Sequence, residues 1–335
     1  MFRKVSEIQY IQCCVVRHKK GGVLKVNLLF SKAILNWLNN VVRIEVKAST
    51  YSDYKYRTEK YILPYFKDRI LEEVVYEDVR SFVSELRNVK TGKALSPNTM
   101  HGIVNILVKF FEYCVTNEIV ITNPCNLVVL PKRKSKRKIT VFTEEERREI
   151  IRALEEEARS KSFLILVALH TGMRIGELCS LKWQCVDMKS RQIRVKTTNR
   201  RIMKNSKTEV LTTSPKTEDS IREIPITPCV MDYLLQLSKL NSEYVFPKSN
   251  GNRYDVRGIQ KYFGLLTRRH GIQEKNFHTL RHTFATTAIE SKMDVKILSR
   301  ILGHSNVNTT LNLYVHPNES KIREAMYNLS AYIVR

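Results

Sequence analysis

The sequence predicts a mainly α-helical protein with a small antiparallel β-sheet, divided into two domains. Apolar residues recur at three- and four-residue spacing through most of the 335 residues, which is the period of amphipathic helices. Three short segments, at 191–198, 208–214 and 220–227, have the composition of strands and predict the sheet. A run of basic residues at 132–138 interrupts the helical pattern and marks the boundary between the domains.

Residues 1–28 permit two interpretations. The stretch CCVVRHKKGGVLKVNLLF predicts either two short strands around Gly21 and Gly22 or a poorly ordered arm. The start of the chain lacks the layout of a signal peptide, and no stretch approaches the roughly 20 apolar residues that a membrane span needs. The seven cysteines are irregularly spaced and form no C-x-x-C pair, which argues against a disulfide framework and a zinc site. We therefore expect a cytoplasmic protein.

Residues 29–130 predict a helical domain. Amphipathic patterns occur in FSKAILNWLNNVV and VYEDVRSFVSEL, and a long pattern opens with Ser96 as helix N-cap and Pro97 at the first helical position. In that last helix Ile103, Leu107, Phe111 and Cys114 share one face. A stripe of tyrosines at 51, 54, 61 and 65 fits either base stacking or the core of the domain, and the core interpretation is favoured.

Residues 131–141 predict a linker, because six of the seven residues 132–138 are Lys or Arg and none of the seven is apolar. The second domain spans 142–335 and begins with a capping box between Thr143 and Glu146. SFLILVALHTG predicts a buried helix that ends at Gly172, and RIGELCSLKW predicts the next helix. After the three predicted strands, the pattern is helical again from RYDVRGIQKYF to the end of the chain.

Charge is the most informative part of the composition. The chain has 57 Lys and Arg residues against 33 Asp and Glu, for a net charge of +24. A charge of this size calls for a polyanionic partner, and nucleic acid is the first candidate. The basic run would then bind DNA phosphates rather than act as a solvated tag. The predicted phosphate-binding residues are Lys132, Arg133, Lys134, Lys136, Arg137 and Lys138.

Four places put unusual polar residues at the ends of predicted elements. They are Arg174 in HTGMRIGEL, Lys216 in SPKTEDSIREIPI, His278 and Arg281 in FHTLRHTFA, and His304 with Tyr314 in LGHSNVNTTLNLY. Each place alone is weak, because arginines at helix starts usually form surface ion pairs and lone histidines usually lie in a core. Together they meet the demands of one reaction, the in-line attack on a phosphodiester.

That reaction builds negative charge on two non-bridging oxygens, which two arginines can bind with bidentate geometry. His304 can donate a further hydrogen bond, and a Lys or His can protonate the leaving oxygen. A tyrosine hydroxyl can be the nucleophile if a base such as His278 helps, because its ordinary pKa is near 10. The scheme requires no metal, and the second domain shows no carboxylate trio for two-metal catalysis. A phosphate-binding G-x-x-x-x-G-K-[ST] loop is also absent from the sequence, so we expect neither a metal nor ATP as cofactor.

These motifs resemble the tyrosine recombinases of the phage integrase family, whose catalytic set is Arg, Lys, His-x-x-Arg, His and Tyr in this order. All six positions are matched, and the resemblance covers roughly residues 29–335. It implies a helical core-binding domain and a catalytic domain that together form a C-shaped clamp on duplex DNA. It also implies a 3′-phosphotyrosine intermediate formed by Tyr314, with strand exchange among four protomers through a Holliday junction.

The resemblance implies partners as well. They are double-stranded DNA attachment sites and three further copies of the chain, with the C-terminal segment that carries Ile322, Met326 and Leu329 packed on a neighbouring protomer or on its own domain. It leaves open a DNA-bending accessory protein or an excisionase, and it predicts association with the nucleoid of a bacterial or phage-infected cell. Residues 1–28 would be a reduced arm-binding element or no module at all.

Three biological readings share this chemistry: an integrase of a phage or conjugative transposon, a resolvase of chromosome or plasmid dimers, and a topoisomerase-like nicking-closing enzyme. The long basic segment TTNRRIMKNSKTEVLTTS before Lys216 favours integration and excision of a mobile element, by analogy. A different class, a helix-turn-helix regulator without activity, would explain the charge and the stretch at 293–314. It would not explain Arg174, Lys216 and HTLRH far upstream.

Overall fold

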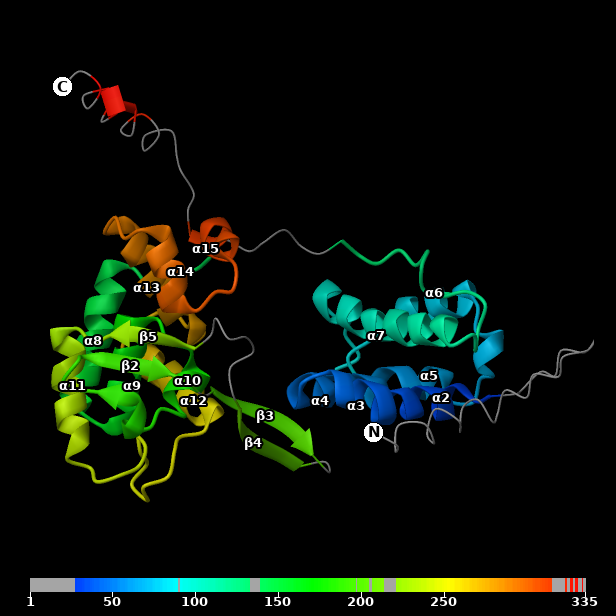
Figure 1. The fold of residues 1–335 in the computed structure, drawn as a ribbon, viewed down its shortest axis with the longest axis horizontal. Coiled ribbons are helices and arrows are strands. Elements are labelled where there is room, and N and C mark those ends of the chain that lie inside the picture. The colour runs from blue at the N-terminus through cyan, green and yellow to red at the C-terminus, as the bar shows by residue number, and fades with distance from the viewer. Residues whose placement is uncertain are drawn as a thin grey trace, which may run out of the picture. The chain divides into compact units, whose positions relative to one another are not determined.

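The computed structural model describes residues 28–89, 91–132, 139–196, 198–204, 207–213 and 221–314, together with single positions in the C-terminal segment. The chain forms two compact units (Figure 1). Unit 1 comprises Met1–Arg137 and Arg201–Glu209, and unit 2 comprises Lys138–Arg200 and Val210–Arg335. The predicted fold class, mainly helical with a small antiparallel sheet, is confirmed. Among the described residues, no helix has both the length and the apolar character to span a bilayer.

Unit 1 is a cluster of helices around an aromatic core. Its helices are α2 (Phe30–Trp37), α3 (Arg43–Glu45), α4 (Ala48–Arg57), α5 (Leu63–Phe66), α6 (Tyr76–Glu85) and α7 (Pro97–Thr116), with wider π-type turns at Leu38–Val42 and Thr58–Ile62. The predicted start of α7 is confirmed, because the Ser96 hydroxyl accepts a hydrogen bond from the backbone N–H of Thr99. The face of α7 that the spacing predicted is fully buried.

The tyrosine stripe belongs to this core. Tyr51, Tyr54, Tyr61 and Tyr65 are partly buried and pack against the buried cluster of unit 1. The ring of Tyr65 contacts Phe66 and Phe82 with centroids 4.8 and 5.3 Å apart. The core interpretation of the stripe therefore holds.

Unit 2 is built around α9 (Ser160–Thr171), an apolar helix that packs against α8, α11 and α13. Nearly every residue of α9 is buried. The elements of unit 2 are α8 (Glu144–Glu157), α9, α10 (Ile175–Leu178), β1 (Val186–Asp187), β2 (Gln192–Val195), β5 (Arg222–Pro225), α11 (Pro228–Ser238), α12 (Val256–Arg269), α13 (His278–Glu290), α14 (Val295–Leu302) and α15 (Val307–Tyr314). Two further strands, β3 (Thr198–Lys204) and β4 (Lys207–Thr213), are divided between the units, because Arg201–Glu209 belongs to unit 1. The capping box at the start of α8 is confirmed by both of its hydrogen bonds.

The predicted sheet was wrong in its composition. The sheet has three antiparallel strands in the order β1-β2-β5, with Ile193 of β2 opposite Val186 of β1 and Ile224 of β5. The segment at 208–214, predicted as one of its strands, instead forms β4 and pairs with β3 in a separate two-stranded sheet. The apolar residues between 198 and 213 are only the adjacent pairs Ile202–Met203 and Val210–Leu211, so the sequence did not indicate which sheet this segment joins.

Two glycines end helices at the point where the candidate site lies. Gly172 follows α9 with φ +63°, and Gly303 follows α14 with φ +64°. Both have the left-handed conformation that glycine adopts without the steric cost of a Cβ. Space also opposes a side chain, because a Cβ at Gly172 would lie 2.5 Å from the Phe284 ring and one at Gly303 would lie in tight contact, 3.0 Å from Arg222.

Candidate active site

Arg281 is the most deeply buried of the predicted site residues. It lies in the first turn of α13 with 3% of its surface exposed. Its Nη1 donates to the Gly172 carbonyl at 2.7 Å, and its Nη2 donates to the Leu302 carbonyl at 2.7 Å. These carbonyls belong to the C-terminal ends of α9 and α14, where the helix dipoles concentrate negative charge that stabilises a cation. Burial, and next the charge of Arg174, lower the pKa of Arg281 to about 9, so it stays protonated at neutral pH.

Arg174 lies beside it at the start of α10. Its Nη2 donates to the Gly303 carbonyl at 3.1 Å, and its Nη1 pairs with Glu177 Oε1 at 3.0 Å. The other oxygen of Glu177 accepts the backbone N–H of Arg174 at 2.9 Å. Glu177 therefore fixes both the main chain and the side chain of Arg174. About a third of that side chain remains exposed, so its guanidinium is accessible to an anion.

Glu177 is held from its other side by Arg222 of β5. The Arg222 guanidinium donates to both carboxylate oxygens, at 3.2 and 2.9 Å, and its Nε donates to the Ile301 carbonyl. Both side chains are almost fully buried. Burial acts to raise the pKa of Glu177, but the hydrogen bonds and charge of Arg222 and the charge of Arg174 outweigh it and hold that pKa below its ordinary value. The pair joins the sheet to α10 and to the end of α14 beneath the site.

His304 follows Gly303 and contacts Arg281 directly. Its Nε2 lies 3.0 Å from Arg281 Nη2, and its Nδ1 lies 2.8 Å from the buried hydroxyl of Thr310. A guanidinium only donates, so Nε2 accepts the Arg281 hydrogen bond and the Nδ1 proton is donated to Thr310. Burial, and next the charges of Arg281 and Arg174, lower the pKa of His304 to about 4. His304 is therefore neutral at physiological pH.

Tyr314, the last residue of α15, is buried with 8% of its surface exposed. Its hydroxyl lies 2.7 Å from Nδ1 of His282. Burial raises the pKa of Tyr314, and the charges of Arg281 and Arg174 oppose that rise without cancelling it. The hydroxyl thus stays protonated at neutral pH and needs a proton acceptor before it can act as a nucleophile.

His278 begins α13 and is more exposed than the other histidines of the site. Its ring meets the ring of His282 edge-on, with centroids 4.8 Å apart. Partial burial, and next the proximity of His282 and Arg281, lower the pKa of His278 to about 4. His278 and His282 lie four residues apart on one face of α13, so the two rings and Tyr314 form a continuous row.

The structure brings together Arg174, His278, Arg281, His304 and Tyr314. Lys216 lies outside the described residues, in the connection between β4 and β5. Of the predicted phosphate-binding run, Lys132 is described and exposed, and the other five residues lie outside the described part of the chain. Residues 1–27 and most of the C-terminal segment also lie outside it. Within the described ranges, the His, Cys, Asp and Glu side chains form no group of three or more suited to hold a metal ion.

Sequence reasoning missed four residues that shape the site. They are Glu177, Arg222, His282 and Thr310. Two of them carried a signal: Glu177 is three residues after Arg174 on a predicted helix, and His282 is four residues after His278. Arg222 carried none, because only the strand order places it under α10. Thr310 carried none either.

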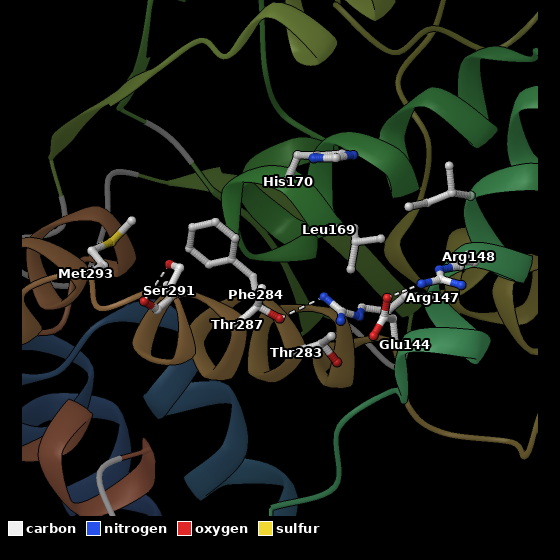
Figure 2. Close-up of a pocket in the computed structure, with 12 residues that line it drawn as sticks. Glu144, Arg147, Arg148, Leu169, His170, Thr283, Phe284, Thr287, Ser291 and Met293 are labelled. Carbon is white, nitrogen blue, oxygen red and sulfur yellow. Dashed lines mark hydrogen bonds and ion pairs between the residues drawn. The ribbon is translucent and has the colours of Figure 1, made fainter. Parts of the chain in front are cut away.

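A pocket of about 460 Å³ lies on a different face of α13, between α13, α8 and α9 (Figure 2). Phe284, Leu169 and Met293 give it an apolar lining. Figure 2 shows Arg147 reaching from α8 to the hydroxyl of Thr287, a hydrogen bond of 3.0 Å. None of the predicted catalytic residues lines this pocket. One face of α13 therefore carries residues of the active site, and another face lines the pocket.

The chain resembles two families of domain along its length. Residues 140–321 match the phage integrase family, and residues 29–87 match the phage integrase N-terminal SAM-like domain. The first match covers more than half of the chain.

Curated relatives extend the match. A tyrosine recombinase XerC-like protein of Caldanaerobacter subterraneus subsp. tengcongensis is 30% identical over 84% of this chain and 77% of its own length. The ICEBs1 integrase of Bacillus subtilis is 27% identical over 83% of this chain and 77% of its own length.

Solved structures share the fold. The Tn1549 transposon integrase, in complex with a circular intermediate DNA, aligns with a TM-score of 0.75 at 21% identity, over 89% of this chain and 98% of that one. A lambda integrase dimer bound to a COC′ core site aligns with a TM-score of 0.63 at 16% identity, over 84% of this chain and 97% of that one. The chain therefore belongs to the phage integrase family and is a tyrosine-type site-specific DNA recombinase.

Proposed function

We propose that Tyr314 is the nucleophile of this recombinase and that Arg174 and Arg281 bind the scissile phosphate. The observation that carries the proposal is the arrangement of the two guanidiniums. Main-chain carbonyls hold both of them, and the charges of both act on the Tyr314 hydroxyl. Guanidinium N–H groups not used in these hydrogen bonds suit the two non-bridging oxygens, on which charge builds during the attack.

The reaction proceeds by exchange of one ester for another. The Tyr314 oxygen forms a bond to phosphorus, the bond from phosphorus to the 5′-oxygen breaks, and the 3′-phosphate remains attached to the enzyme. The leaving oxygen takes a proton, and Lys216 is the proposed donor on the strength of its motif. Religation reverses these steps, with a 5′-hydroxyl as the attacking group and the tyrosine as the leaving group.

His304 has to change partners during this reaction. In the free protein its Nε2 accepts a hydrogen bond from Arg281, so it cannot donate there to a phosphate. When Arg281 turns its N–H groups to the phosphate, the proton on Nδ1 can shift to Nε2, and Thr310 can reverse its hydroxyl to donate to Nδ1. His304 then donates to a non-bridging oxygen. Before DNA binds, the phosphate-binding groups Arg281 and His304 are thus hydrogen-bonded to each other.

We infer that the biological role is the integration and excision of a mobile element. Two similarities support it: the ICEBs1 integrase among the relatives and the Tn1549 transposon integrase among the folds. In this role four protomers assemble on double-stranded attachment sites of the nucleoid DNA. The C-terminal segment packs on a neighbouring protomer, and a DNA-bending protein or excisionase sets the direction.

Resolution of chromosome or plasmid dimers is the second candidate. The similarity to the XerC-like protein favours it, at 30% identity. The two roles use the same chemistry and differ in the DNA sites. The identity of the cleaved DNA is therefore the observation that separates them.

Covalent capture of DNA tests both the role of Tyr314 as nucleophile and the biological role of the recombinase. The wild-type protein, Tyr314→Phe and the matched control Tyr233→Phe are incubated with DNA of the replicon and host, denatured, and the protein-linked fragments are sequenced. Tyr233 is buried in the same unit and its hydroxyl donates to Glu155, away from the site. We expect adducts at a 3′ end from the wild type and Tyr233→Phe and none from Tyr314→Phe, which keeps DNA binding.

The outcomes are distinct. An adduct from Tyr314→Phe would remove Tyr314 from its role. Captured ends of a mobile element and its insertion site support the integrase role, whereas a single chromosomal or plasmid site supports the resolvase role. Tight and specific binding without any adduct would support the regulator reading.

A further inference from the structure

His282 is the only described side chain hydrogen-bonded to the Tyr314 hydroxyl, at 2.7 Å. It stands outside the six-residue set that the sequence motifs define. It lies in the second turn of α13, one residue after Arg281, and its ring faces Tyr314 with centroids 5.7 Å apart. The ring is half-buried, and its Nδ1 edge is turned toward the tyrosine. A ring nitrogen at this distance is in line to take the phenolic proton.

We propose that His282 is a catalytic residue that takes the proton of Tyr314 during DNA cleavage and returns it during religation. This inference rests on the proposed role of Tyr314 as nucleophile. In cleavage the Tyr314 oxygen bonds to phosphorus while its proton moves to Nδ1 of His282. In religation the bond from phosphorus to the tyrosine breaks, and the Nδ1 proton returns to the phenolate oxygen.

The other two histidines of the site are less suited to this step. Both ring nitrogens of His304 are engaged, one with Arg281 and the other with Thr310. His278 contacts the ring of His282 edge-on, which orients that ring. The sequence had offered His278 as an example of the base, and the geometry assigns the step to the next histidine on the same helix face.

The surroundings of His282 keep it neutral and able to accept. The groups that face it are His278 and Arg281 on its own helix and Tyr314 on α15. Burial, and next the charge of Arg281, lower the pKa of His282 below its ordinary value of 6.5. At neutral pH the ring therefore carries one proton. In the tautomer that the proposed step uses, that proton lies on Nε2 and Nδ1 keeps a lone pair for the tyrosine.

Asparagine separates proton transfer from positioning. In His282→Asn the amide oxygen takes the place of Nδ1 and accepts the same hydrogen bond, but it does not take up a proton at neutral pH. His282→Ala removes both functions. His270→Asn is the matched control, because Nδ1 of His270 pairs with Glu149 on the surface of the same unit.

The assay measures single-turnover cleavage of a duplex that carries the site recovered by covalent capture. A second duplex carries sulfur in place of the 5′-bridging oxygen at the scissile phosphate. The thiolate leaves this duplex without a proton donor. A variant that fails only to protonate the leaving group therefore cleaves this duplex at the normal rate, whereas a variant that fails to deprotonate the tyrosine cleaves it slowly. Filter binding of the intact duplex is measured in parallel.

We expect His282→Asn and His282→Ala each to lose about 10²- to 10⁴-fold in cleavage rate on both duplexes, the usual contribution of a positioned base, with unchanged DNA binding. In the wild type the rate falls as the pH is lowered through the pKa of His282, because a protonated Nδ1 no longer accepts. This inflection is absent from His282→Asn. His270→Asn behaves as the wild type.

Three results would overturn the inference while leaving the nucleophile in place, since wild type still forms the adduct and Tyr314→Phe does not. One is a wild-type rate in both variants. Another is a wild-type rate in His282→Asn with a loss only in His282→Ala, which limits His282 to positioning. The third is a defect in His282→Asn that disappears on the sulfur-bridged duplex, which makes His282 a proton donor to the leaving group.

Discussion

Replacing Gly172 with alanine tests how closely the active site is packed around the end of α9. Gly172 has φ +63°, and a Cβ there would lie 2.5 Å from Phe284 Cδ1 and 3.0 Å from Leu302 Cδ2. Its carbonyl also accepts a hydrogen bond from Arg281. The substitution therefore strains the main chain and pushes on two neighbours, one of which also contributes its carbonyl to Arg281.

Two contributions determine how much unfolding free energy Gly172→Ala loses. A left-handed conformation costs a non-glycine residue about 1–2 kcal/mol. Forcing a methyl group into a packed site costs about 1–3 kcal/mol more. We expect Gly172→Ala to lose about 2–5 kcal/mol of unfolding free energy. Gly271→Ala is the matched control, because Gly271 has φ +65° with nothing within 4 Å of its Cβ position, and only the first term applies.

The assay is urea unfolding followed by tryptophan fluorescence, and it has to report unit 2 alone because the units need not unfold together. The chain has two tryptophans: Trp37 lies in the core of unit 1 and Trp183 in unit 2. A Trp37→Phe background in every variant leaves the unit 2 probe. Cleavage rate is measured beside it, and we expect Gly172→Ala to lose activity and Gly271→Ala to keep it.

Equal losses of stability in Gly172→Ala and Gly271→Ala would refute the reasoning, because they would show that the contact term at Gly172 is absent. A destabilised Gly172→Ala with a normal cleavage rate would show that Arg281 does not depend on the position of that carbonyl.

Three further predictions concern the groups around the site and the linker. Glu177→Gln removes the carboxylate that pairs with the buried Arg222 and should cost about 3–5 kcal/mol at neutral pH, measured by the same unfolding assay. The folded pKa of Glu177 lies below its ordinary 4.5, so its contribution to stability is present above that value and is lost as the pH falls through the folded pKa. The acid branch of the stability curve should therefore be shallower in the variant. Thr310→Val should lower unit 2 stability by about 1–3 kcal/mol and slow cleavage, because Nδ1 of His304 loses its hydroxyl partner, and an unchanged rate would contradict the assigned tautomer. Neutralising the six basic residues of 132–138 should reduce the slope of log binding constant against log salt by up to about 5, measured by filter binding, and an unchanged slope would mean that the linker does not contact phosphate.

Periodicity and end signals predicted most of the described helices. The helix predicted over RIGELCSLKW is shorter than expected, because α10 spans only Ile175–Leu178. Ser96 with Pro97, and Thr143 with Glu146, mark helix starts through local hydrogen bonds that depend on neighbouring residues only. Gly172 marks a helix end for the same reason. The sheet was predicted less well, because strand pairing depends on residues distant in sequence. The two-residue strand β1 has too few residues to show a period at all.

The active site shows the same difference between features set by local sequence and features set by contacts between distant residues. Arg174, Arg281, His304 and Tyr314 were found because their types and order meet one chemical demand. The structure adds what holds them: a carboxylate under Arg174, an arginine under the carboxylate, and a hydroxyl behind His304. Arg222 lies 45 residues from Glu177 in sequence, and only the pairing of β2 with β5 brings it beneath α10. No local pattern predicts such a contact.

The contacts that hold the two arginines determine which neighbouring positions tolerate substitution. Arg281 is held by the carbonyls of residues 172 and 302, Arg174 is held partly by the carbonyl of residue 303, and every amino acid supplies a carbonyl. The side chain at 302 can therefore be replaced by another apolar side chain during evolution while its carbonyl still accepts from Arg281. Glu177 and Arg222 depend on both side chains, so we expect them to be replaced only jointly. A library randomised at 177, 222 and 302 should return many single solutions at 302 and paired solutions at the other two.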